Sequence, residues 1–265
     1  MRTAILSSAF MVEFPLFYLA FFIFGICLGS FSNVLIHRLP SEQSIVDPVW
    51  SYCPSCKNTL KWWMNIPLLS WVVLKFQCYF CKKPISPQYP LVELLVGLAF
   101  CGVYYRYGWS VTTLEYCVFS WGLITASTID FHHYILPDVF TISGIILGLV
   151  GAYLSPERDF FEALWGFALG FGFLWGMAKV FFLLKGIEGM GGGDIKLIGW
   201  IGAYLGISSI PFTIFVSSFL GSVIGLIFIA ISGKNMRTTG IPFGPFLSLG
   251  ALIFLFFQPI DFLFF

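Results

Sequence analysis

Eight long apolar stretches, separated by short polar breaks, run along the chain. They lie at Phe14–Ile36, Leu91–Tyr107, Val111–Ile129, Val139–Leu154, Phe161–Leu184, Ile195–Gly206, Ile210–Ile231 and Phe243–Phe257. Most approach the roughly 20 residues that a helix needs to cross a bilayer, and the sixth is shorter and rich in glycine. The apolar–polar alternation of membrane β-strands is absent. The pattern therefore predicts an all-α polytopic membrane protein with about eight transmembrane helices.

The composition narrows the class of protein further. Of the 265 residues, 58% are hydrophobic and only 10% are charged, whereas soluble domains carry about 25% charged residues. So few charges cannot solvate a surface of this size, which argues against a soluble enzyme. The net charge of +1 supplies no field that would attract a nucleic acid. We expect the lipid bilayer as surroundings and no nucleic-acid partner.

The largest polar break runs from Arg38 to Pro90 and contains six lysines and arginines. Basic residues favour the cytoplasmic side of a membrane protein, so this break is predicted to be cytoplasmic. Counting spans then places residues 131–138, 185–194 and 232–242 on the same side, the last with Lys234 and Arg237. The first stretch resembles a signal peptide, but it is interrupted by Glu13 and is long enough to span, so we expect it to be retained.

The cytoplasmic break contains two pairs of cysteines, Cys53-Pro-Ser-Cys56 and Cys78-Tyr-Phe-Cys81, with 21 residues between them. Two such pairs can supply four thiolates to a tetrahedral zinc ion, about 2.3 Å from each sulfur. Four protein ligands leave no open position on the metal, so we predict a structural zinc site. A redox-active dithiol and unliganded thiols remain alternatives. The other cysteines lie in apolar stretches, where packing is expected: Cys27, Cys101 and Cys117.

Two acidic residues lie at the ends of apolar stretches. Asp130 ends the third stretch, and Asp194 closes the segment Gly-Met-Gly-Gly-Gly-Asp (residues 189–194) and opens the sixth. Since these two stretches run in opposite directions, both carboxylates are expected on the cytoplasmic side. Two carboxylates that share a site keep one proton between them, so one can activate water while the other polarises a peptide carbonyl. The pair predicts aspartic-protease chemistry.

Other roles for these residues stay open at this point. Asp194 could cap the helix that it opens, Asp138 could cap the helix after Pro137, and Asp130 could pair with Lys196. The glycine run lacks the Gly-Lys-Ser/Thr ending of a phosphate-binding loop, and the chain has no His-Glu-x-x-His metal motif.

The first stretch places Gly25, Gly29, Asn33 and His37 at intervals of four residues, hence on one helical face. Small residues allow close helix packing, and the polar pair is expected to point into the bundle, for packing or for binding. Glu93, early in the second stretch, is another acid on the cytoplasmic side, either structural or facing substrate.

Together these segments resemble the type IV prepilin peptidases, also called leader peptidase/N-methyltransferases. The resemblance covers most of the chain in unbroken order. It is carried by Gly25–Pro40, the two cysteine pairs, Asn65–Trp71, Ile85–Leu95, Asp130–Asp138 and Gly189–Leu197.

The resemblance implies a GxGD-type aspartic protease of the bacterial inner membrane, with Asp130 and Asp194 as its catalytic pair. Similar enzymes cut type IV prepilins and pilin-like precursors on the cytoplasmic side, after a glycine that precedes a hydrophobic helix. Those with the cysteine-bearing loop also methylate the new N-terminal residue with S-adenosylmethionine. Weaker candidates for binding substrate or methyl donor are Asn33, His37, Arg38, Glu93, Gly191, Gly192, Gly193 and Lys196.

We therefore expect a first transmembrane helix at 1–37, a zinc-binding and methyltransferase region at 38–90, and a seven-helix protease core at 91–265. One alternative is a peptidase without methyltransferase activity, whose zinc loop clamps the substrate. Another is a proton-coupled transporter. Against transport, the apolar stretches show no inverted repeat, and the acids cluster at one face.

Overall fold

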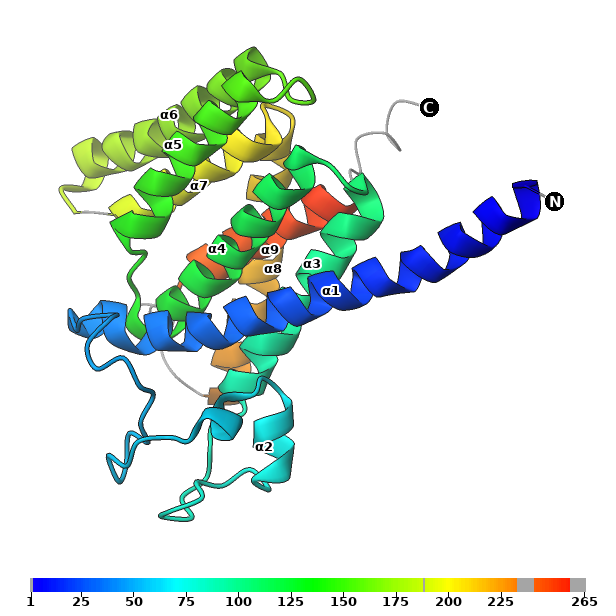
Figure 1. The fold of residues 1–265 in the computed structure, drawn as a ribbon. Helices are drawn as coiled ribbons and strands as arrows, with labels where there is room; N and C mark the ends of the chain where they lie inside the picture. Colours follow the sequence, from blue (N-terminus) through cyan, green and yellow to red (C-terminus); the bar gives the residue numbers. More distant parts are fainter. Residues whose placement is uncertain (1, 188, 233–240, 258–265) are drawn as a thin grey trace. The chain divides into compact units, whose positions relative to one another are not determined.

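The computed structural model describes residues 2–187, 189–232 and 241–257, which form helices joined by short connections and by one long, mostly irregular segment between α1 and α3 (Figure 1). The helices are α1 (Arg2–Arg38), α2 (Leu69–Val73), α3 (Gln88–Tyr107), α4 (Val111–His133), α5 (Asp138–Leu154), α6 (Phe160–Lys185), α7 (Gly192–Leu205), α8 (Ser209–Ser232) and α9 (Gly244–Phe257), with 3-10 turns η1 (Leu39–Ser41) and η2 (Trp62–Asn65). Extended pairing within the described part of the chain is limited to two isolated bridges. The all-α prediction is confirmed.

Each of the eight apolar stretches corresponds to one helix, and most of the predicted ends differ from the observed ends by up to three residues. The larger differences are at the end of α4, which lies four residues past the predicted end, and at the start of α1, which begins at Arg2 and continues through Pro15. Among the residues that the structure describes, four helical segments could cross a membrane by length and composition. They are Pro15–Ser41, Gln88–Tyr107, Phe160–Lys185 and Ser209–Phe228. The count of eight transmembrane helices remains a prediction. Most of the expected loop 232–242, with Lys234 and Arg237, lies outside the described residues.

The chain divides into two compact units, Met1–Thr113 and Leu114–Phe265, which are described one at a time. In the first unit, α1 and α3 pack antiparallel at very short range. A Cβ on Gly29 would lie 2.6 Å from the Cα of Glu93, and one on Gly25 would lie 2.8 Å from the Cα of Gly97. Glycines at these positions let the two backbones approach closely. The glycine face predicted for the first stretch is therefore the face that packs on α3.

The second unit is organised around α7, whose side chains are buried almost all round. Figure 1 shows α7 beside α5 and α6. The backbones of Gly166 in α6 and Gly202 in α7 meet directly, and the indole ring of Trp200 in α7 fills the space above Gly144 in α5. A helix enclosed in this way has a fixed axial position. Because Asp194 lies in the first turn of α7, this packing also determines where that carboxyl group lies.

A buried arginine holds the C-terminal end of α7. The guanidinium of Arg158 forms an ion pair with Glu115 of α4 at 2.6 Å, and its side chain is 6% exposed. It also donates hydrogen bonds to the carbonyl oxygens of Ala203 and Tyr204, at 2.7 and 3.0 Å. These carbonyls belong to the last turn of α7, which has no following turn to bond with. Arg158 thus ties α4 to the end of α7.

Candidate active site and metal centre

The two cysteine pairs are each held in a tight knuckle. The amide of Lys57 donates to the carbonyl of Cys53 at 2.8 Å, and the amide of Lys82 donates to that of Cys78 at 3.0 Å. Both lysines have a positive φ, 59° and 57°, so the residue that closes each knuckle adopts the left-handed backbone conformation. An isolated antiparallel bridge joins the residues on either side of each knuckle, Tyr52 with Thr59 and Gln77 with Pro84. Each pair of sulfurs is therefore presented by its own local turn.

The four sulfurs of Cys53, Cys56, Cys78 and Cys81 all lie within 4.8 Å of one another, and all four thiols are free. The Sγ atoms of Cys53 and Cys81 are 4.0 Å apart. Around a tetrahedral zinc with bonds of about 2.3 Å, neighbouring sulfurs are separated by about 3.8 Å. The donor set and the spacing fit a metal ion, and the predicted four-cysteine cluster is confirmed.

Asp130 lies in the last turn of α4 and is buried. Its Oδ2 accepts a hydrogen bond of 3.1 Å from the backbone N–H of Gly244, the first residue of α9. A Cβ at position 244 would lie 2.6 Å from this oxygen, so glycine is needed for the close approach. Burial raises the pKa of Asp130, and the Gly244 N–H opposes the rise.

Asp194 is half-buried in the first turn of α7, and its own amide bonds to the carbonyl of Gly191. The residue that caps α7 is Gly191, so the capping role considered for Asp194 is wrong. Burial, and then the neighbouring Asp130 carboxylate, raise the pKa of Asp194 to about 7. The two carboxyl groups therefore share one electrostatic environment, at helix ends outside the four apolar segments. Below about pH 7 the pair can hold a single proton.

The glycine run before Asp194 is open to the outside at its start. A Cβ added at Gly192 would meet no other group within 4 Å, and at Gly191 only the Asp194 carboxylate would come close, at 3.8 Å. Gly193 packs against Leu136, where a Cβ would come within 2.9 Å of the leucine side chain. The run thus leaves free space beside Asp194 on one side and fits tightly on the other.

Lys196 does not bind Asp130. Its Nζ forms an ion pair of 2.5 Å with Asp138, the first residue of α5. The pairing of Lys196 with Asp130 that the sequence left open is wrong, because the Lys196 ammonium is paired with Asp138 in the first turn of α5 instead. The carboxylate of Asp130 accepts the hydrogen bond from Gly244 and acts electrostatically on Asp194.

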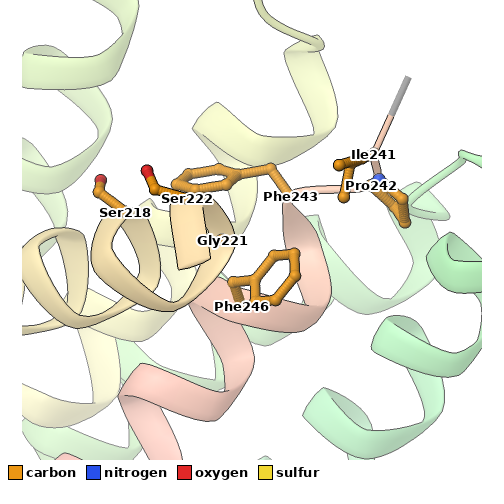
Figure 2. Close-up of a pocket in the computed structure, with 7 residues that line it drawn as sticks. All are labelled: Ser218, Gly221, Ser222, Ile241, Pro242, Phe243 and Phe246. Carbon is orange, nitrogen blue, oxygen red and sulfur yellow. The ribbon is translucent and has the colours of Figure 1, made fainter. Parts of the chain in front are cut away.

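A pocket of about 290 Å³ lies next to Gly244, between α8 and the start of α9 (Figure 2). It is lined by Ser218, Gly221, Ser222, Ile241, Pro242, Phe243 and Phe246. Figure 2 shows Ser218 and Ser222 on α8, the Phe246 ring on α9, and the Phe243 ring extending from the start of α9 towards Ser222. Phe243, which lines the pocket, directly precedes Gly244, whose N–H binds Asp130.

In the first unit, Asn33 and His37 meet the start of α3 through Tyr89. The Asn33 amide donates to the Tyr89 carbonyl at 3.2 Å, and the Tyr89 hydroxyl lies 2.8 Å from Nε2 of His37. The Oδ1 of Asn33 is buried and has no hydrogen-bond partner among the described residues. The structure therefore brings two of the weaker candidates together and leaves one buried acceptor unused.

The other two candidates in this unit have separate partners. The buried Arg38 donates to the carbonyls of Ser44 and Pro48, each at 3.0 Å. The buried Glu93 accepts a hydrogen bond of 2.7 Å from the amide of Leu68. Both side chains hold segments of the 39–87 region in place.

Comparison with known proteins decides the family. Residues 23–107 match the family model described as Bacterial Peptidase A24 N-terminal domain, and residues 117–226 match the Type IV leader peptidase family. Curated proteins named prepilin leader peptidase/N-methyltransferase are similar over most of their length. One from Stutzerimonas stutzeri is 36% identical over 92% of both chains, and one from Pseudomonas aeruginosa is 34% identical over 92% of both. A third, from Myxococcus xanthus, is 39% identical over 83% of this chain and 65% of its own.

The chain belongs to the type IV leader peptidase family. This confirms the resemblance recognised in the sequence. No solved structure matches the chain at a significant level.

Sequence reasoning missed three contacts in this member of the leader peptidase family. Gly244 lies 114 residues from Asp130, and no local signal connects them apart from the Gly-Pro dipeptide that starts α9. Tyr89 lies within the resembling stretch Ile85–Leu95, but nothing in that stretch points to its partner on α1. Arg158 lies in a short loop between two apolar helices, where its charge alone gives no sign that it is buried.

Proposed function

We propose that this protein is a membrane-embedded aspartic endopeptidase that removes the leader of type IV prepilins and pilin-like proteins, and that it then methylates the new N-terminal residue with S-adenosylmethionine. The observation that carries the proposal is the pair Asp130 and Asp194. A buried and a half-buried carboxyl group on different helices, one of which raises the pKa of the other, can share one proton as an aspartic protease requires. The names of the similar proteins support both activities.

The pair would cleave a peptide bond without any other nucleophile. The ionised carboxylate takes a proton from water, whose oxygen attacks the carbonyl carbon, while the protonated carboxyl donates its proton to the carbonyl oxygen. The C–N bond then breaks: the leaving amine takes a proton from the pair, and one hydroxyl of the tetrahedral intermediate returns its proton to the pair as the new carboxyl group forms. The proton belongs to the pair as a unit. The Gly244 N–H fixes the orientation of Asp130 throughout.

Free space beside the pair supports a protein substrate. The open start of the run Gly191, Gly192 and Gly193 leaves room for an extended backbone next to Asp194. The pocket beside Gly244, with its two phenylalanine rings, can take an apolar side chain of the substrate close to the scissile bond. Lys196, paired with Asp138, lies in the same first turn of α7 as Asp194.

We assign the protein to the bacterial inner membrane with eight transmembrane helices and the carboxylate pair facing the cytoplasm. The division proposed is a first helix at 1–37, a region 38–90 for zinc and methyl transfer, and a protease core at 91–265. Four strongly apolar helices and the basic residues of the 38–90 region support this arrangement. A cut on that side would fall just outside the substrate's own membrane helix.

We propose Zn²⁺ as the ion of the four-cysteine cluster, held by Cys53, Cys56, Cys78 and Cys81. Four thiolates in a tetrahedral set suit zinc, which in such closed sites stabilises the fold. The ion would hold the two knuckles together, and the positive charges of Lys57 and Lys82 beside them would offset the negative charge of the site.

For methyl transfer we propose the α1–α3 junction as the place of binding, with Asn33, His37, Arg38 and Glu93 as candidate residues. The unused Oδ1 of Asn33 supports this, because a buried acceptor without a partner is costly and an amine of a bound molecule could satisfy it.

Mass spectrometry of the product tests the proposal. Purified protein in lipid is incubated with a prepilin and S-adenosylmethionine, and we expect a product that lacks the leader and is heavier by one methyl group at its new N-terminus. A cleaved but unmethylated product would favour the peptidase-only alternative. An uncut prepilin under conditions where the protein is folded would reject the proposal and revive the proton-coupled transporter.

A further inference from the structure

The segment between the two cysteine knuckles, residues 61–76, is unusually apolar for a region between membrane helices. Its sequence is Lys-Trp-Trp-Met-Asn-Ile-Pro-Leu-Leu-Ser-Trp-Val-Val-Leu-Lys-Phe, and it contains η2 and α2. Met64 is buried, the Trp63 ring packs edge-on against Tyr79, and the Trp71 indole donates to the carbonyl of Ile85. These inward side chains hold the segment to the rest of its unit.

A second set of apolar side chains in the same segment is exposed. It consists of Trp62, Ile66, Leu69, Val72, Val73 and Phe76. Trp62 is 76% exposed and Val73 is 67% exposed. Side chains of this kind, gathered in one short segment, are costly in water and mark a surface that contacts a membrane or another molecule.

The charged side chains of the stretch that contains this segment are all positive. From Pro48 to Val92 the chain contains five lysines and no aspartate or glutamate. Lys61 is the first residue of the segment and Lys75 is the last but one. All five lysines are exposed. A surface that combines exposed apolar side chains with unbalanced positive charge matches the headgroup region of an anionic membrane. It repels a basic peptide and therefore does not suit a positively charged leader.

A hydrogen bond anchors the segment near the start of α3. The amide of Leu68, a residue held at a positive φ of 60°, donates to Glu93 at 2.7 Å. Glu93 lies five residues into α3, about 7.5 Å along the axis of this apolar helix. A segment tied at that level to a helix able to cross a membrane lies beside the headgroups rather than in bulk water.

We propose that residues 61–76 form an interfacial element that lies in the headgroup layer and binds anionic lipid. Trp62, Leu69, Val72 and Val73 enter the boundary between headgroups and acyl chains, where tryptophan is favoured. Lys61 and Lys75 bind the lipid phosphates. The element would thereby fix the height of the four-cysteine cluster relative to the bilayer. The proposal concerns a lipid surface and does not depend on which reaction the protein catalyses.

Hydrogen–deuterium exchange of the full chain in nanodiscs tests the proposal. Exchange of amides in residues 61–76 is compared between discs of neutral phosphatidylcholine and discs in which about one third of the lipid is phosphatidylglycerol. We expect exchange to be at least about fivefold slower in the anionic discs, the factor that the attraction of one lysine to such a surface provides. Added salt should remove most of the difference.

Two pairs of lysine variants distinguish lipid binding by residues 61–76 from a general effect of the protein's positive charge. Lys61→Gln with Lys75→Gln should abolish the difference between the two lipids. Lys179→Gln with Lys185→Gln, which removes the same charge from α6, should leave it unchanged. Equal exchange in both lipids would overturn the proposal and indicate that another part of the chain covers the segment. Slower exchange only after a prepilin is added would overturn it in favour of a protein partner.

Discussion

The four-cysteine cluster and the carboxylate pair are built in opposite ways. Each half of the cluster is a four-residue turn, closed by its own backbone hydrogen bonds and bridge. The carboxylates come from different helices, and the group that orients Asp130 lies 114 residues away in the chain. A site made of local turns depends on its ligand, whereas a site made of distant helices depends on how those helices pack. The two should therefore respond to different perturbations.

The largest effect is expected from removing ligands of the cluster. Replacing Cys53 and Cys78 together with serine should reduce bound zinc from about one ion per chain to almost none, because binding to a structural site of this type is worth roughly 10–16 kcal/mol. Metal analysis of the purified protein measures this. Serine at Cys27 and Cys101, which lie outside the cluster, is the matched control. A wild-type protein that is stable and free of metal would contradict the assignment.

Removing the buried arginine should disturb the second unit and leave the cluster intact. Arg158→Met leaves Glu115 and the last carbonyls of α7 without their partner. We expect the free energy of unfolding to fall by about 3–5 kcal/mol, measured by denaturant titration, with the zinc content unchanged.

Two further variants control that measurement. Lys179→Met removes a positive charge from an exposed position in α6 and should have little effect. Adding Glu115→Leu to Arg158→Met should recover part of the loss, because no buried charge is then left alone. An Arg158→Met protein as stable as wild type would show that the ion pair does not hold α7.

Adding one methyl group at a tightly packed position beside α7 should also lower the free energy of unfolding, by less than the loss of Arg158 does. In Gly144→Ala the new Cβ overlaps the indole ring of Trp200, and overpacking of this sort costs about 1–3 kcal/mol. Gly176→Ala is the matched control, because no atom outside its chain neighbours and its own helix backbone lies within 4 Å of its Cβ position. Thermal unfolding of both variants measures the difference. Equal stability of the two would contradict the close packing of α5 on α7.

Cleavage should depend on pH through the shared proton. The pKa of Asp194 is raised to about 7 by burial and by Asp130, so the pair loses its proton as the pH rises through about 7. Above that value the rate should fall by about tenfold per pH unit, and it should also fall in acid as the second carboxylate is protonated. Initial rates across a pH series measure the profile. A rate that is constant from pH 6 to about 9 would contradict a proton shared by the pair.

The raised pKa of Asp194 also makes the stability of the folded protein depend on pH. A carboxyl group whose pKa is raised in the folded state holds its proton more tightly than it does in the unfolded chain. Its contribution to the free energy of unfolding is therefore fully present in acid, below the ordinary pKa of an aspartate. It is lost as the pH rises through about 7. Asp194→Asn should remove this part of the pH dependence of unfolding.

Much of this arrangement follows from the sequence, and the remainder depends on tertiary contacts. Apolar length predicted the helices, and cysteine spacing predicted the cluster, because both are local properties. The opposite directions of two apolar stretches suggested that Asp130 and Asp194 meet at one face. Nothing local could show that Lys196 binds Asp138 or that Gly244 binds Asp130, because those contacts depend on how α5, α7 and α9 pack.

The single variants Asp130→Asn and Asp194→Asn test the carboxylate pair most directly, with cleavage of a prepilin in lipid as the measurement. Each amide keeps the size of the side chain but cannot share the proton, so each variant should lose cleavage by a factor of about 10³ or more while remaining folded. Asp159→Asn is the control, because asparagine caps α6 as well as aspartate does. Near wild-type cleavage by either Asp130→Asn or Asp194→Asn would contradict the assignment of the active site.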